Sequence, residues 1–165
     1  MSFGPQSDTT GSGVRVSLIL CHNNAADRLP WTLGHLKRLV PGVSWELIAV
    51  DNASTDPRGH ELLAAFAKDI EAPVLLLKEP NPGKQWAFRT GALAARGEFL
   101  VMVDDDNGLT RRYLERMVAI FEAKPQAAMG GGRGELVTEA LVPDGFEAVQ
   151  FRWGGGPQGQ RETAA

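Results

Sequence analysis

The 165-residue sequence has a single cysteine, Cys21, and only three histidines. One cysteine excludes an internal disulfide bond, and the histidines lack zinc-type spacing, which agrees with a reducing compartment. We expect Cys21 to be a small buried residue at a strand end rather than a nucleophile. No apolar run approaches the length of a membrane span, and residues 1–13 lack the charged and apolar regions of a signal peptide. The default expectation is a cytoplasmic protein.

An excess of positive charge is also absent. The formal net charge is −3 and the pI is about 5.6, so nothing indicates a protein that binds nucleic acid. Hydrophobic residues make up 43% of the chain and charged residues 22%, which is typical of one soluble folded domain.

Strand-like apolar runs alternate with helical patterns along most of the chain. The expected strands are Val14–Leu20, Trp45–Val50, Val74–Leu77 and Glu98–Val103. The expected helices are Asp27–Val40, Asp56–Ile70, Gly83–Arg96 and Thr110–Lys124. This alternation predicts an α/β fold with a mainly parallel sheet, right-handed crossovers and helices on its faces. Asp27, Asp56 and Thr110 are expected to be N-caps of their helices.

Three consecutive carboxylates, Asp104, Asp105 and Asp106, follow the apolar run Phe99–Val103. Parallel sheets bind ligands outside the carboxyl ends of their strands, which is where these aspartates are expected to lie. Hard oxygen ligands suit Mg²⁺ or Mn²⁺, and such an ion takes the rest of its shell from water and a substrate diphosphate. For an aspartate run taken alone, the alternative is a solvated acidic turn.

A second polar cluster, Asp51–Asp56, follows the second expected strand. Because the carboxyl ends of neighbouring strands meet at one edge, Asp51 is expected to share a crevice with the three aspartates. Asp51 can accept hydrogen bonds from a nucleobase imide or a ribose hydroxyl, whereas Asp56 is expected to cap the next helix. Asn52 is typical of turn chemistry and is also a candidate for substrate binding.

The third cluster, Asn81–Gly91, follows the third expected strand. Its Gly83-Lys84 pair opens a helix, where unpaired N–H groups favour an anion, and Lys84 adds a point charge against a phosphate. The segment does not match a Walker loop. Arg89 is weighed evenly between an anion ligand and a solvated or ion-paired side chain. His22 is expected to be a surface residue rather than a nucleotide contact.

The order of these clusters resembles glycosyltransferase family 2, whose members are inverting enzymes of the GT-A fold. The matching segments are Val16–Leu20, Val50–Asp56, Gly83–Ala87, Ala95–Phe99 and Val103–Asp106. The resemblance implies a nucleotide-diphospho-sugar donor and an Asp-x-Asp pair that binds a divalent metal, Mn²⁺ or Mg²⁺.

By position in the family pattern, Asp104 and Asp106 are the metal ligands. The resemblance also implies that Asp51 contacts the nucleobase or ribose and that Lys84 lies in the diphosphate-facing segment. Asn52, Asp104 and Asp105 complete the substrate-binding candidates.

Two features depart from the family pattern. The segment Cys21–Asn24 lacks the aromatic residue that would stack on the base. The family's general base is usually an Asp or Glu well past the metal motif, and this chain ends at Ala165, so we expect a truncated acceptor side and leave the base unassigned. The remaining carboxylates, each expected to be a surface acid, are Glu135, Glu139, Asp144 and Glu147.

The expected parts are a flexible tail at 1–13, a nucleotide-sugar-binding GT-A domain at 14–130 and an irregular segment at 131–165.

The sequence therefore predicts a glycosyltransferase in which the metal neutralises charge on the departing nucleoside diphosphate and a carboxylate deprotonates the acceptor hydroxyl. A glycan or lipid-linked acceptor, as in polysaccharide biosynthesis, would bring the protein to the inner face of a membrane without a transmembrane segment. Two alternatives stay open. One is a non-catalytic remnant that binds nucleotide sugars. The other is a nucleotidyltransferase, although its usual basic, glycine-rich loop after the first strand is absent.

Overall fold

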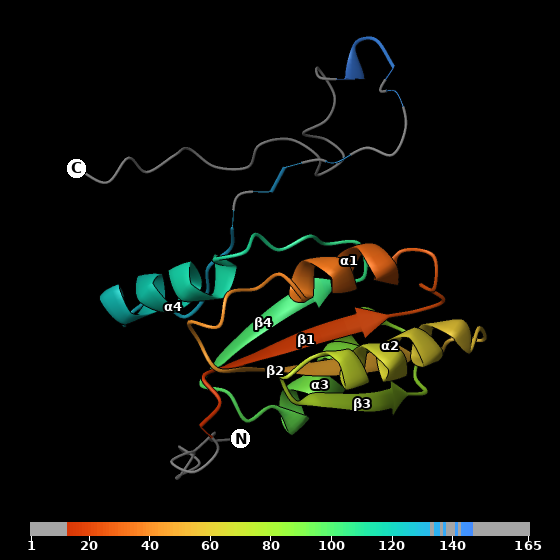
Figure 1. Ribbon diagram of the computed structural model, residues 1–165, viewed down its shortest axis with the longest axis horizontal. Helices are drawn as coiled ribbons and strands as arrows, with labels where there is room; N and C mark the ends of the chain where they lie inside the picture. Colours follow the sequence, from red (N-terminus) through yellow and green to blue (C-terminus); the bar gives the residue numbers. More distant parts are fainter. Residues whose placement is uncertain (1–12, 133, 136, 138–140, 142, 147–165) are drawn as a thin grey trace. The chain divides into compact units, whose positions relative to one another are not determined.

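The computed structural model describes residues 13–132, 134–135, 137, 141 and 143–146. The chain divides into two compact units, residues 1–123 and 124–165, and the first holds all the helices and strands of the described part (Figure 1). None of these helices has the length and apolar character needed to cross a membrane. Residues 1–12 of the expected tail and most of the expected irregular segment lie outside the described residues.

Strands and helices alternate strictly. The strands are β1 (Val16–His22), β2 (Trp45–Asn52), β3 (Val74–Glu79) and β4 (Phe99–Asp104). The helices are α1 (Leu29–Leu36), α2 (Arg58–Asp69), α3 (Lys84–Ala94) and α4 (Tyr113–Ala123). All neighbouring strands pair in parallel, in the order β3-β2-β1-β4 (Figure 1). The α/β fold with a parallel sheet that the sequence predicts is confirmed.

The strands extend further toward the carboxyl edge than their apolar runs. Strand β1 includes Cys21 and His22, β2 includes Asp51 and Asn52, and β4 ends at Asp104. Parallel pairing places His22 opposite Asp51 and Cys21 opposite Asp104. Backbone N–H and C=O groups pair whatever side chain they carry, so hydropathy alone ends each strand too early.

The expected helix caps need correction. Helix α1 follows Arg28 without a side-chain capping bond, so Asp27 is not its N-cap, and Pro30 occupies the first turn instead. Helix α4 begins at Tyr113, three residues after Thr110, whose carbonyl accepts the Tyr113 N–H at 3.0 Å.

At α2 the expected cap is wrong by one position but right in its chemistry. Pro57, not Asp56, directly precedes the helix. Even so, Oδ1 of Asp56 accepts the N–H of Arg58, the first helical residue, at 3.0 Å.

Each face of the sheet has its own core. Helices α1, α2 and α4 cover one face, where Leu18 and Leu20 of β1 are fully buried. Helix α3 covers the other face, where Ile19 of β1 packs with Ala87 (Figure 1). This alternation follows from side chains pointing to opposite faces along a strand. Helix α3 approaches closely because of Gly91, where a Cβ would lie only 2.5 Å from Cγ2 of Ile19.

A buried carboxylate ties the amino edge of the sheet together. Glu46 of β2 is 3% exposed, and its Oε1 accepts bonds from the Ser17 hydroxyl at 2.7 Å and the Arg96 N–H at 2.9 Å. Its Oε2 accepts Nε and Nη2 of Arg96 at 2.9 and 2.6 Å. Burial opposes ionisation, but the hydrogen bonds from Ser17 and Arg96 outweigh it and lower the pKa of Glu46. This network connects β2, β1 and the turn between α3 and β4.

We expect Glu46→Gln to reduce the free energy of unfolding by about 1–3 kcal/mol at pH 7, because it removes the buried negative charge that accepts Nε and Nη2 of Arg96. Since folding lowers the pKa of Glu46, its contribution is complete above the pKa of the unfolded chain and is lost as pH falls through the folded pKa. The difference in unfolding free energy between Glu46→Gln and the wild type should therefore be smaller in acid than at pH 7. Urea denaturation at pH 7 and at acidic pH measures it.

The matched control for this experiment is Glu98→Gln. Glu98 pairs with Arg15, but its side chain is 60% exposed. The cost there should stay below about 0.5 kcal/mol. Equal costs for the two variants would contradict the role given to Glu46.

Candidate functional site

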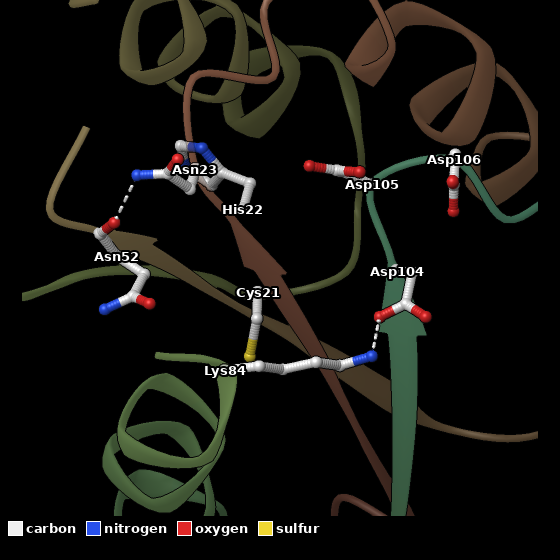
Figure 2. A pocket seen from close by; sticks show the side chains of 8 residues that line it. All are labelled: Cys21, His22, Asn23, Asn52, Lys84, Asp104, Asp105 and Asp106. Carbon is white, nitrogen blue, oxygen red and sulfur yellow. Dashed lines mark hydrogen bonds and ion pairs between the residues drawn. The ribbon is translucent and has the colours of Figure 1, made fainter. Parts of the chain in front are cut away.

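A pocket of about 260 Å³ opens at the carboxyl edge of the sheet. Its walls come from the ends of β1, β2 and β4 and from the first residue of α3 (Figure 2). The lining residues are Cys21, His22, Asn23, Asn52, Lys84, Asp104, Asp105 and Asp106. The structure thus brings together five of the six site residues that the sequence singles out, and Asp51 is the one that does not line the pocket.

Lys84 and Asp104 face one another across this pocket. The Lys84 Nζ forms an ion pair with Oδ1 of Asp104 (Figure 2). Lys84 opens α3 directly after Gly83, whose φ of +128° is a conformation that suits glycine. The amino end of α3 and the ammonium group therefore place positive charge on one wall, opposite the aspartates on the other.

The three consecutive aspartates point to three different partners. Both oxygens of Asp105 accept bonds from Arg28, at 3.0 Å from Nε and 2.9 Å from Nη2, and its side chain is 14% exposed. Asp106 is exposed, and its Oδ1 accepts Nδ2 of Asn107 at 3.2 Å. Asp105 therefore ties the turn after β4 to the segment before α1, while Asp106 faces solvent at the pocket rim.

The donor set suits a hard divalent ion that is shared with a ligand. Asp104 and Asp106 offer carboxylate oxygens, the ligands that Mg²⁺ and Mn²⁺ prefer. Among the residues with described positions, no three His, Cys, Asp or Glu side chains stand close enough to hold a metal by themselves. Asp104 and Asp106 are therefore the two residues that could hold such an ion, and its other ligands would have to come from outside this set.

Asn52 is committed to holding the loop that carries Lys84. It is 6% exposed, and its Nδ2 donates to the carbonyls of Glu79 and Asn81 at 3.2 and 2.6 Å. Its Oδ1 accepts the Gly83 N–H at 2.8 Å. The side chain thus bridges the end of β2 to the whole segment between β3 and α3.

Glu79 also helps to hold the segment between β3 and α3, and the sequence analysis missed it. Its carboxylate accepts the Thr90 hydroxyl at 2.6 Å and the N–H and Nδ2 of Asn81 at 2.8 Å. Hydrogen bonding from Thr90 and then Asn81 lowers the pKa of Glu79. A carboxylate two residues before the Asn-Pro-Gly turn was the available signal. Arg89 lies exposed on α3 with its charge acting on Glu79, outside the pocket lining.

Asp51 is held beside the pocket by its own loop. It is half-buried, and its Oδ1 accepts the Ser54 N–H at 3.0 Å. The loop after β1 supports the same turn, since Oδ1 of Asn24 accepts the N–H groups of Thr55 and Asp56 at 2.9 and 3.0 Å. The carboxylate of Asp51 therefore has a defined orientation at the tip of β2.

His22 is not the surface residue that the sequence predicts. It is 3% exposed because β1 continues two residues beyond its apolar run. Its ring packs on the start of α2, where a Cβ at Gly59 would lie 3.2 Å from Cε1 of His22. Burial lowers the pKa of His22, although the carboxylates of Asp51 and Asp105 oppose this shift.

Cys21 agrees with its prediction as a small buried residue at a strand end, with 8% of its surface exposed. Burial is the main cause that raises the pKa of its thiol, to about 11. The thiol is therefore protonated at neutral pH, which argues against a nucleophile. Of the candidate general bases, Glu135 and Asp144 are exposed, while Glu139 and Glu147 lie outside the described residues.

Comparison with known proteins places this geometry in context. A family model described as glycosyl transferase family 2 matches residues 17–140, which is more than half of the chain. A dolichyl-phosphate beta-glucosyltransferase, ALG5A, of Trichomonas vaginalis is 30% identical over 136 residues, covering 75% of this chain and 42% of that protein. A glucosyl-3-phosphoglycerate synthase of Mycolicibacterium paratuberculosis is 31% identical over 96 residues, covering 58% of this chain and 29% of that protein.

The fold also has solved counterparts. TarS of S. aureus, residues 1–349 in complex with UDP, superposes with a TM-score of 0.59 at 18% identity, covering 81% of this chain and 39% of that one. At this identity the likeness shows the fold, and it confirms the expected GT-A architecture. The chain spans less than half the length of the curated relatives it matches.

We expect Asn52→Ala to lower the free energy of unfolding by about 1–3 kcal/mol, because the Gly83 N–H and the carbonyls of Glu79 and Asn81 lose their partner. Hydrogen exchange should also speed up at the Gly83 amide, which Asn52 accepts directly. Asn23→Ala is the matched control, since exposed Asn23 donates one bond, to the Asn52 carbonyl at 2.7 Å. Unchanged protection of the Gly83 amide in Asn52→Ala would contradict the role of Asn52 in holding the loop before α3.

Proposed function

The chain belongs to glycosyltransferase family 2, and from this premise we propose that it is the donor-binding part of an enzyme that transfers a sugar from a nucleotide-diphospho-sugar to an acceptor. One observation carries the proposal. The pocket at the carboxyl edge sets Lys84 against Asp104 and Asp106, which is the charge pattern that a diphosphate and a divalent ion need together. The nucleotidyltransferase alternative is set aside because the family match favours glycosyl transfer.

In this proposal the diphosphate lies between the amino end of α3 and the turn after β4. Lys84 contacts a phosphate oxygen, and helix α3 adds its N-terminal dipole. Asp104 and Asp106 would hold Mn²⁺ or Mg²⁺, which supplies charge neutralisation for the departing nucleoside diphosphate. Asp105 acts through Arg28 by keeping the turn in place, and Asn52 does the same for the loop before Lys84.

The nucleoside is proposed to lie at the tip of β2, where Asp51 accepts hydrogen bonds from the base or ribose. The TarS structure with UDP supports a uridine nucleotide as the first donor to test. The names of the two relatives described above support a glucosyl group as the sugar.

Those names also support an acceptor that carries phosphate, because one name contains dolichyl phosphate and the other contains glucosyl-3-phosphoglycerate. A phosphate monoester is already ionised near neutral pH, so attack by one of its oxygens needs no general base. Attack by a hydroxyl would need a carboxylate to take its proton. A lipid-linked acceptor would bring this pocket to the cytoplasmic face of a membrane.

The first test concerns metal. Asp106→Asn should weaken UDP binding in the presence of Mn²⁺ at least tenfold, about 1.4 kcal/mol, because a bound ion dominates the charge of its site. Calorimetric titration of UDP with Mn²⁺ and with EDTA measures this. Asp69→Asn is the control, since Asp69 ends α2 with its side chain 65% exposed and does not line the pocket. Equal UDP affinity of the wild type with Mn²⁺ and with EDTA would exclude the metal-linked site.

The second test concerns the nucleoside. Asp51→Asn removes the charge but keeps an oxygen that can accept the Ser54 N–H, so the melting temperature should stay close to that of the wild type. UDP affinity should fall by about 0.5–1.5 kcal/mol, the usual size of one hydrogen bond. Asp56→Asn, which alters the Arg58 cap, should leave UDP affinity unchanged. If Asp56→Asn weakened UDP binding and Asp51→Asn did not, the roles proposed for the two aspartates would be the wrong way round.

A further inference from the structure

The Lys84–Asp104 pair raises a question about the donor-free pocket, because Asp104 is also a proposed metal ligand. The ammonium group of Lys84 rests on Oδ1 of Asp104. A divalent ion at Asp104 and Asp106 would meet this positive charge at the same carboxylate. Two cations that share one ligand repel each other, so the ion and Lys84 favour different states of the pocket.

The neighbouring carboxylates make Asp104 the group on which this conflict falls. Asp105 is neutralised by its bidentate contact with Arg28. In the part of the chain that the structure describes, Asp106 accepts Asn107 and takes part in no ion pair. Of the two proposed metal ligands, Asp104 is therefore the one already occupied by a cation.

The pair is built so that Lys84 can leave without disturbing the fold. The two side chains are 50% and 39% exposed, and exposed ion pairs are individually weak. The backbone under Lys84 is held by the Asn52–Gly83 hydrogen bond. A flexible four-carbon stem then lets the ammonium group move while the start of α3 stays in place.

We propose that Lys84 and a divalent cation compete for Asp104, and that a nucleoside diphosphate settles the competition by drawing Lys84 onto its own phosphate oxygens. This inference rests on the proposed donor site. Lys84 then acts as a placeholder that weakens metal binding until the donor arrives. Because binding linkage is reciprocal, the metal and the nucleotide must each tighten the other by the same factor.

The test is a titration of the nucleotide-free protein with Mn²⁺, in which electron paramagnetic resonance measures the concentration of free Mn²⁺. Lys84→Met should bind Mn²⁺ about threefold or more tightly than the wild type, given the usual strength of an exposed ion pair. Lys84→Gln should behave in the same way, and it provides a second variant that removes the charge. Lys84→Arg keeps the charge and should give no increase.

Lys37→Met is the matched control. Lys37 pairs with Asp69 at 3.1 Å with side chains 46% and 65% exposed, and neither residue lines the pocket. Its Mn²⁺ affinity should equal that of the wild type. An equal increase in the Mn²⁺ affinity of Lys37→Met and Lys84→Met would mean that the change in net charge causes the effect. That result would overturn the proposed competition.

Repeating the titrations with UDP measures the coupling between metal and nucleotide. UDP should tighten Mn²⁺ binding by a larger factor in the wild type than in Lys84→Met, because only the wild type has Lys84 to displace. Suppose that the wild type binds UDP with Mn²⁺, but that the charge-removing variants bind Mn²⁺ no more tightly than the wild type in the absence of nucleotide. This result would overturn the inference and leave the proposed function standing. A wild type that binds neither ligand would overturn both.

Discussion

The parallel pairing of β1 with β2 on one side and β4 on the other is the constraint on which the rest of the site depends. This pairing runs to the last residues of the strands, where it sets Cys21 beside Asp104 and His22 beside Asp51. Polar groups that lie far apart in the sequence therefore share one edge of the sheet. Helix α3 completes the pocket because Gly91 lets it approach β1 closely enough to bring Lys84 over that edge.

The charges at this edge are arranged in pairs rather than in a cluster. Arg28 holds Asp105, and Lys84 holds Asp104, while Asp106 stays at the rim. Around them, the uncharged amide of Asn52 and the carboxylate of Glu79 fix the backbone before α3. A rigid loop that carries a movable ammonium group is well suited to a ligand with its own phosphate charges, which is why we favour a diphosphate rather than a preformed metal centre.

Hydropathy and order along the chain were sufficient to predict the alternating fold, the parallel sheet and the shared edge for most of the polar clusters. The ends of elements were harder, because β1 and β2 continue through polar residues that pair by their backbones. This is why His22 was expected at the surface but is buried. The partners of Asn52 could not be inferred, since they lie far along the chain on a segment placed by the crossover between β2 and α3. The cap expected at Asp27 failed because α1 begins beyond it, next to Pro30.

The central claim is that one pocket holds a nucleoside diphosphate and a divalent ion between α3 and the turn after β4. A crystal structure of the chain with UDP and Mn²⁺, with anomalous scattering recorded for manganese, tests it most directly. The account predicts an anomalous peak within ligand distance of Asp104, Asp106 and a diphosphate oxygen. It also predicts that the Lys84 ammonium group has moved from Asp104 to the diphosphate. Manganese at another place, or UDP bound away from Lys84 and the aspartates, would contradict it.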